Sequence, residues 1–298
     1  MTRALKLLGS LIAIGFLLLA LWQGGREMPR IDLSSVRAWS GISIAFLLYV
    51  LGQMIGAVAW RGTLLIYGVR LIPWRAESQL LVSQILKYIP GNIAHLFGRG
   101  VLARADGVAA STIVLAMLLE VGFLLGVGAA ISGLLVLTAP EFVRGLSGAL
   151  PQLPVSPPVI AGGLAVCIGL VVLLIRRRAR RYDPVPARMR FAVIPIGLHA
   201  VNFCVLGLSL WAVTLAIPSE PGVGPVFCTG VFVIAWCAGF VTPGAPGGIG
   251  VREGIITLGL GLVIGGGPAL AAALLHRLVS VLGVVAAFGI GWLLRRGG

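Results

Sequence analysis

The chain has 298 residues, of which 58% are hydrophobic and 11% charged, and its mean hydropathy is +1.05. Charged side chains at this low frequency cannot cover the surface of a soluble globule. The sequence therefore predicts an all-α integral membrane protein. The net charge of +14 does not indicate nucleic-acid binding, because there is no soluble basic domain and few aromatic residues lie among the basic ones. The positive net charge is better explained by an excess of Lys and Arg on the cytoplasmic side of a membrane.

Residues 1–138 form the first half of the predicted architecture. In chain order we expect a span at 5–22, a span at 39–67, a re-entrant helical hairpin at 74–104 and a span at 108–137. The first segment has about the minimum spanning length, and a cleaved signal peptide is the alternative. The hairpin is expected because its two apolar pieces are each too short to cross a bilayer and are separated by Pro90 and Gly91.

A Pro-rich loop at 139–158 leads to the second half, residues 159–298. In chain order we expect spans at 159–175 and 190–217, a re-entrant hairpin at 225–264 and a span at 269–294. The second hairpin is interrupted at 242–253, which reads TPGAPGGIGVRE. Prolines remove backbone donors and glycines free the backbone angles, so no continuous helix can run through this stretch. The predicted break or hinge residues of the two hairpins are Pro90, Gly91, Pro243, Pro246, Gly247, Gly248 and Gly250.

Each half therefore reads span, span, hairpin, span, which gives six spanning helices and two re-entrant hairpins. Three crossings per half make the halves inverted repeats, with the two hairpin tips meeting near the midplane, an architecture typical of alternating-access transport. The alternative is that the breaks are kinks in full spans, which gives eight crossings. We expect a bacterial-type inner membrane and cytoplasmic N- and C-termini. In this orientation the following basic residues lie on or towards the cytoplasmic side: Arg70, Arg75, Lys87, Arg99, Arg104, the basic cluster at 176–190, Arg295 and Arg296.

Charged residues inside apolar segments are the strongest functional candidates. Glu120 and Arg277 lie well inside predicted spans, where each ionised group costs roughly 2.5–3.5 kcal/mol on insertion scales, so both should face the protein interior. We expect Arg99, Arg252 and Arg277 to line a basic cavity, with Glu120 and Glu253 as internal counter-ions. The sequence does not show which acid pairs with which base, and a purely structural ion-pair network is the alternative.

A new helix is predicted to begin beyond each break, near Asn92 in the first half and near Ile249 in the second. The unpaired N–H groups and the positive end of such a helix favour an anion. Asn92, as a candidate N-cap, and His276, as a candidate cavity-lining residue, complete the predicted substrate-binding set.

Other kinds of chemistry have no support in the sequence. The three histidines are far apart and lack the nearby Cys or carboxylate companions of a metal site. There is no Gly-x-Ser-x-Gly elbow, Walker loop, Rossmann fingerprint or pair of close catalytic acids. The four cysteines lie in apolar runs and are interpreted as packing residues. We therefore expect no catalytic residue, metal or cofactor, and no enzyme activity.

The motif KYIPGN at 87–92, then Arg99 and Glu120, then PGGIGVRE at 246–253 and the pair His276–Arg277 resemble the lysylphosphatidylglycerol synthase transmembrane family. This is the flippase-like domain also found in the multiple peptide resistance factor, and the resemblance covers nearly the whole chain. The residues that match the family pattern are Pro90, Gly91, Arg99, Glu120, Pro246, Gly247, Gly248, Gly250, Glu253 and Arg277. Nothing corresponds to the soluble aminoacyl-tRNA-dependent synthase domain of that factor, and the loops are too short to contain it, so lysyl transfer is not expected.

The resemblance implies movement of lipids with polar or charged headgroups between leaflets, and stand-alone relatives are associated with polyprenyl-linked sugars, hopanoids and envelope glycans. We expect a flippase that moves an anionic or zwitterionic headgroup lipid, including an aminoacyl phospholipid, by alternating access. The alternatives are a membrane-embedded transferase on lipid-linked sugars and a non-transporting subunit of an envelope-glycan assembly complex. The expected partners are the lipid substrate and the bilayer, with a homodimer left open and no nucleic acid.

Overall fold

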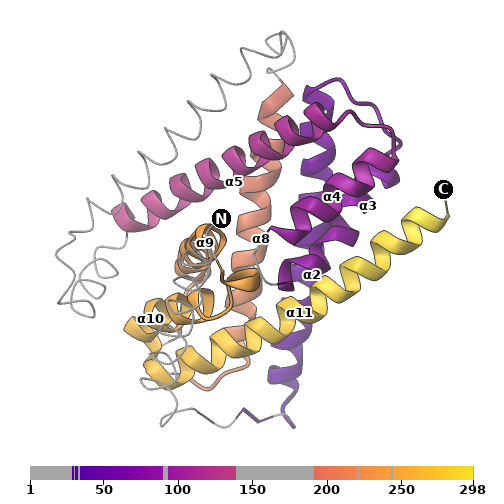
Figure 1. Ribbon diagram of the computed structural model, residues 1–298. Helices are drawn as coiled ribbons and strands as arrows, with labels where there is room; N and C mark the ends of the chain where they lie inside the picture. Colours follow the sequence, from indigo (N-terminus) through magenta and orange to yellow (C-terminus); the bar gives the residue numbers. More distant parts are fainter. Residues whose placement is uncertain are drawn as a thin grey trace.

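The computed structural model describes residues 29, 31–32, 34–89, 93–138, 191–219, 222–242 and 244–297. All regular structure in these residues is helical, as the sequence predicts (Figure 1). The helices are α2 (Val36–Ile66), α3 (Pro73–Ser83), η1 (Gln84–Tyr88), α4 (Ala94–Ala105), α5 (Ala110–Thr138), α8 (Val193–Leu215), α9 (Pro225–Val241), η3 (Pro246–Gly248), α10 (Val251–Ile264) and α11 (Gly266–Arg296). The predicted spans at 5–22 and 159–175, the loop at 139–158, and Pro90, Gly91, Asn92 and Pro243 lie outside the described residues.

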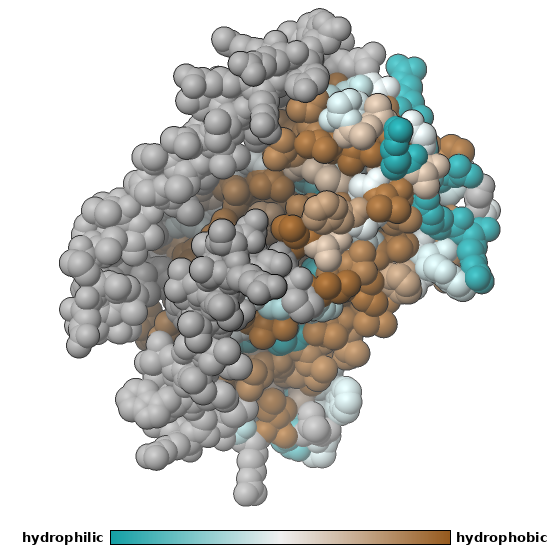
Figure 2. Space-filling view, in the orientation of Figure 1, coloured by the Kyte–Doolittle hydropathy of each residue, from teal (hydrophilic) through white to brown (hydrophobic). Residues whose placement is uncertain are grey.

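Five helical stretches are long and apolar enough to cross a membrane, which makes this a multi-pass membrane protein. They are 36–66, 110–135, 193–215, 246–264 and 266–296. Large apolar side chains point outward from them, among them Leu47 on α2, Val114 on α5 and Leu282 on α11. Figure 2 shows apolar residues over most of the described face, and hydrophilic residues gathered towards the end where the C-terminus and the α3–α4 pair lie.

The stretch 246–264 is not one continuous helix. Gly247 has φ 57° and Gly250 has φ 83°, both in the left-handed region that glycine tolerates. Helix α10 itself has 14 residues, a length of about 21 Å, which is less than the roughly 30 Å hydrocarbon core of a bilayer. Helices α3 and α4, with 11 and 12 residues, are shorter still. These short helices pack in pairs, α3 with α4 and α10 with the 17-residue α9.

Two helices begin a few residues from their predicted starts. Residues 265–268 were expected to end the second hairpin, but only Gly265, with φ 81°, breaks the helix, and α11 begins at Gly266. Pro268 is tolerated there because the N–H groups of a first helical turn have no partner within the helix. In the first half, α4 begins at Ala94 with Ile93 at its N-cap, where the sequence predicted Asn92.

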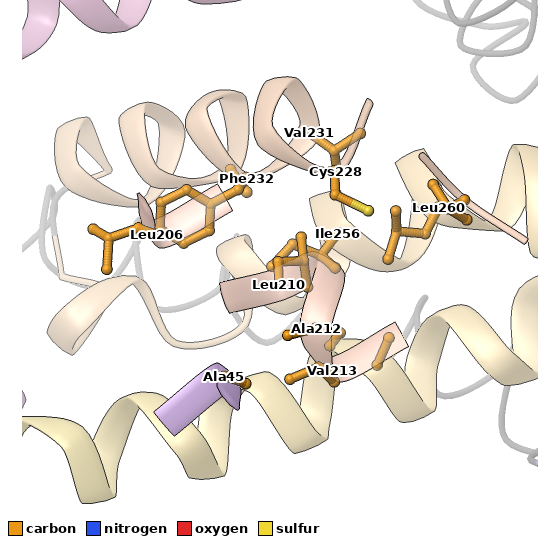
Figure 3. Packing of buried hydrophobic residues seen from close by; sticks show 14 of the residues in the cluster. Ala45, Leu206, Leu210, Ala212, Val213, Cys228, Val231, Phe232, Ile256 and Leu260 are labelled. Atoms are coloured by element: carbon orange, nitrogen blue, oxygen red, sulfur yellow. The ribbon is translucent and has the colours of Figure 1, made fainter. Parts of the chain in front are cut away.

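Helices α2 and α8 form the centre of the bundle and pack closely along each other. Gly41 on α2 lies so near α8 that an added Cβ would stand 2.8 Å from the Ala212 carbonyl oxygen. Ser209 Oγ on α8 also donates to the Ala45 carbonyl oxygen at 2.8 Å. Small residues and interhelical hydrogen bonds of this kind hold helices together in an apolar environment. The main core, part of which is seen in Figure 3, joins α8 and α2 to residues of α9 and α10 such as Phe232 and Leu260.

The helix contacts of the two halves correspond to each other. Let α2, α3, α4 and α5 of the first half correspond to α8, α9, α10 and α11 of the second, in that order. The contact between α3 and α11 then corresponds to the contact between α9 and α5, and both contacts occur. The same correspondence relates α2–α3 to α8–α9, α4–α5 to α10–α11, and α2–α11 to α8–α5, all of which occur. In Figure 1, α5 and α11 accordingly run along opposite sides, with the α3–α4 and α9–α10 pairs towards opposite ends.

A polar network fixes the last turn of α11 to the first half. The Arg295 guanidinium donates to both Asp106 carboxylate oxygens, at 2.9 and 3.2 Å. Gln79 Nε2 donates to Asp106 Oδ2 at 2.7 Å, and its Oε1 accepts from Trp60 Nε1 at 3.0 Å. The network therefore joins α2, α3, the end of α4 and α11.

We predict that Gly207→Ala destabilises the bundle, because a Cβ at this position of α8 would stand 2.5 Å from the Thr229 Cα, which belongs to the backbone of α9. Overpacking of this kind costs about 1–3 kcal/mol. Gly197→Ala, in the same helix, is the matched control, because nothing lies within 4 Å of its added Cβ. Thermal unfolding in detergent measures both variants, and equal midpoints for the two would refute the close contact of α8 with α9.

Candidate functional site

The two interrupted regions meet in the interior of the described bundle. The end of η1 contacts η3, so that a Cβ added to Gly247 would lie 3.3 Å from the Tyr88 ring. The Arg277 guanidinium of α11 lies 5.3 Å from the centroid of the same ring. Tyr88, from the first half, thus packs against the break of the second half at Gly247.

Two adjoining cavities open beside this contact. The larger encloses about 100 Å³, several times the roughly 30 Å³ that one water molecule takes up in the liquid. Its polar lining comes from α2, η1, α4, α5, α8, α9 and α10 and comprises Tyr49, Gln53, Gln84, Lys87, His95, Arg99, Glu120, His199, Asn202, Trp236 and Arg252. The smaller encloses about 20 Å³, and its polar lining is Tyr49, Trp236, Arg252, Glu253, His276, Arg277 and Ser280. Tyr49, Trp236 and Arg252 line both cavities.

Arg99 on α4 and Glu120 on α5 form one buried ion pair. Arg99 Nη1 lies 2.6 Å from Glu120 Oε2, and the two residues are only 3% and 2% exposed. The guanidinium also lies 4.4 Å from the Trp60 ring centroid, so an aromatic face covers it on α2. Because a buried ion whose partner is removed is costly, this pair fixes α4 against α5.

Glu253 and Arg277 form the second ion pair, between α10 and α11. Glu253 Oε2 accepts the Gly250 backbone N–H at 2.6 Å, which caps the start of α10, and its Oε1 lies 3.4 Å from Arg277 Nη1. Arg277 Nη1 also donates to the Gly247 carbonyl oxygen at 3.1 Å. The expected anion site at the start of α10 is therefore taken up, in part, by the protein's own carboxylate.

Lys87 and Arg252 differ from these arginines because neither has a carboxylate partner among the described residues. Lys87 Nζ lies 3.3 Å from Tyr49 Oη. The Arg252 guanidinium lies 5.6 Å from the Trp236 ring centroid. Aromatic rings attract a cation without cancelling its charge, and both side chains line the larger cavity.

The histidines contribute unpaired polar atoms to the cavity walls. His95 Nδ1 and both ring nitrogens of His199 are buried without a hydrogen-bond partner among the described residues, and both side chains line the larger cavity. His276 lies between the rings of Tyr49 and Phe232, at centroid distances of 6.0 and 5.5 Å, and lines the smaller one. Within the described ranges, no three His, Cys, Asp or Glu side chains come together as a metal site would require.

The structure divides the predicted substrate-binding residues between the two cavities. Arg99, Glu120 and Arg252 line the larger, whereas Arg252, Glu253, His276 and Arg277 line the smaller. Sequence reasoning missed Lys87, Tyr49, Gln53 and Asn202 as a polar set. Lys87 directly precedes an aromatic residue and a break within an apolar region, but from the sequence we expected it on or towards the cytoplasmic side and not in the substrate-binding set.

The fold and the site define a multi-pass α-helical membrane protein with a charged internal cavity between broken helices. The sequence matches the family described as lysylphosphatidylglycerol synthase TM region over residues 6–287, and the chain belongs to this family. A search of curated proteins found no match.

We predict that Glu120→Gln destabilises the protein by about 3–5 kcal/mol, because it leaves Arg99 as an unpaired buried charge. Glu77→Gln is the control, since Glu77 pairs with Arg61 at 3.0 Å in a more exposed position, where such pairs contribute about 0–1 kcal/mol. Unfolding midpoints in detergent compare the two variants. A loss no larger for Glu120→Gln than for the control would show that the buried pair does not hold α4 against α5.

Proposed function

We propose that the protein is a lipid flippase that moves a lipid with an anionic or zwitterionic headgroup between the leaflets of a membrane. The observation that carries this proposal is the larger cavity, which is polar and charged although it lies among apolar membrane helices. Ionisable residues at such depth are costly and generally mark a substrate or ion pathway. A headgroup in the cavity would contact Arg252 and the hydrogen-bonding groups beside it, while its acyl or prenyl tail stays in lipid.

The proposed mechanism is alternating access by two inverted halves. The pairs α3–α4 and α9–α10 act as re-entrant hairpins, one in each half, that meet where Tyr88 contacts Gly247. Support comes from the correspondence of helix contacts when the halves are exchanged, since transporters of this kind bind substrate at the interface of inverted repeats. Opening of one half against the other would expose the cavity first to one leaflet and then to the opposite one.

The non-transporting alternative receives less support. A purely structural assembly subunit was expected to pack its hairpins without a cavity around Arg252 and Arg277, whereas both arginines line cavities. A transferase would need an acid or base free to act on substrate; His95 and His199 line the larger cavity and could serve, whereas Glu120 and Glu253 are each engaged by an arginine. We therefore propose transport without a chemical step, with proton exchange at Glu120 or Glu253 as the candidate coupling reaction.

The test is translocation in proteoliposomes of a fluorescent polyprenyl-phosphate sugar and a fluorescent aminoacyl phospholipid. We predict that Arg277→Ala and Glu253→Ala abolish protein-dependent movement, because each removes a contact between α11 and the break that forms the cavity wall. Arg61→Ala, at a more exposed ion pair, serves as the control for general effects of removing an arginine. Full activity in both cavity variants, or movement of neither lipid by folded wild-type protein, would contradict the proposal.

A further inference from the structure

The charges around the cavities do not balance. Four basic and two acidic side chains line them, so two positive charges are in excess. Apart from Asp32, which is exposed, every described carboxylate has a basic partner: Glu77 with Arg61, Asp106 with Arg295, Glu120 with Arg99 and Glu253 with Arg277. The excess therefore resides on Lys87 and Arg252.

Both of these side chains line the larger cavity, and each is partnered among the described residues by an aromatic ring rather than by a carboxylate. Lys87 is 9% exposed, and its Nζ lies 5.8 and 5.3 Å from the ring centroids of Tyr49 and Tyr88. The Arg252 side chain crosses directly over Gly248, where a Cβ would stand 2.6 Å from Nε, and this Nε has no hydrogen-bond partner among the described residues. The two cations come from opposite halves, line the same cavity and lie within Coulombic range of Tyr49.

We propose that Lys87 and Arg252 bind the negative charge of the headgroup, and that the lipid carried is anionic overall. This inference rests on the lipid-transport function proposed above and narrows its substrate class. A polyprenyl phosphate, a monoester with a charge of about −1.5 to −2, would neutralise most of the excess positive charge, and the singly charged phosphodiester of phosphatidylglycerol would neutralise part of it. A lysyl-bearing phospholipid has more ammonium than phosphate groups, and no described carboxylate at the cavities is free to receive its amines.

The neutral groups of the same cavity fit the remainder of such a headgroup. Asn202 Oδ1, His95 Nδ1 and the His199 ring nitrogens are buried without partners among the described residues. Asn202 Oδ1 can accept from a hydroxyl group, and a histidine ring nitrogen can donate or accept according to its tautomer, so a phosphate that carries a polyol or a sugar would satisfy them.

The inference is tested by binding, which does not require transport. The purified full chain in detergent is titrated with fluorescent polyprenyl phosphate, with dioleoyl phosphatidylglycerol and lysyl-phosphatidylglycerol as competitors. We expect the phosphatidylglycerol to compete and the lysyl lipid not to. Lys87→Gln and Arg252→Gln should each weaken binding about tenfold or more, the effect of losing one hydrogen bond to a charged group. Lys87→Arg should retain binding, and Arg296→Gln, which removes an exposed charge at the end of α11, should leave it unchanged.

The unfolding midpoint distinguishes the Lys87 and Arg252 variants from variants of the buried ion pairs. Because Lys87 has no carboxylate partner among the described residues, Lys87→Gln should leave the unfolding midpoint unchanged or raise it, in contrast to Glu120→Gln. If Arg252→Gln fails to fold, Lys87→Gln and the charge reversal Lys87→Glu, which should abolish polyprenyl phosphate binding, still decide the result.

Each other outcome has a defined meaning. Binding of polyprenyl phosphate that is unaffected by Lys87→Gln, or equal competition by the lysyl lipid, would overturn the inference even if the protein translocates lipids. Binding that Lys87→Gln weakens, without translocation in proteoliposomes, would support the anionic site and remove the transport proposal.

Discussion

A helix that stops inside a membrane leaves backbone N–H and C=O groups that lipid cannot hydrogen-bond, so protein groups must take them up. At the start of α10 these groups are the Gly250 N–H, which donates to Glu253, and the Gly247 carbonyl, which accepts from Arg277. Because Arg277 belongs to α11, satisfying the break also fixes α11 against it. The cavity wall, the start of α10 and the last helix thus depend on the same few polar contacts.

The two buried ion pairs lie at corresponding positions in the two halves, with the acid and the base exchanged. In the first half, the base Arg99 lies on the helix after the break and the acid Glu120 on the next helix; in the second half, the acid Glu253 comes first and the base Arg277 follows. Each pair therefore joins a short helix, α4 or α10, to the long helix that follows it, α5 or α11. Since each pair is neutral, neither contributes net charge to the cavity, and its potential is set by Lys87 and Arg252.

The sequence predicted those features that depend on local composition. Apolar length alone placed α9 at 225–241 and came within a few residues of α2, α5 and α8. It did not show which acid pairs with which base, because pairing depends on distances between helices. The neighbours Arg252 and Glu253 both line the smaller cavity, but only Arg252 also lines the larger one. The spacing of Gly250 and Glu253 fits a capping interaction and was a local signal that could have shown how Glu253 is used.

Lys87 shows why local rules can hide a functional residue. A basic side chain near the end of a helix is stabilising by itself, so its position needed no further explanation until the fold brought Tyr49 of α2 to its ammonium group. An aromatic partner holds a buried cation without cancelling its charge, whereas a carboxylate does cancel it. The kind of partner therefore separates the cations that join helices, Arg99 and Arg277, from those left able to attract an anion.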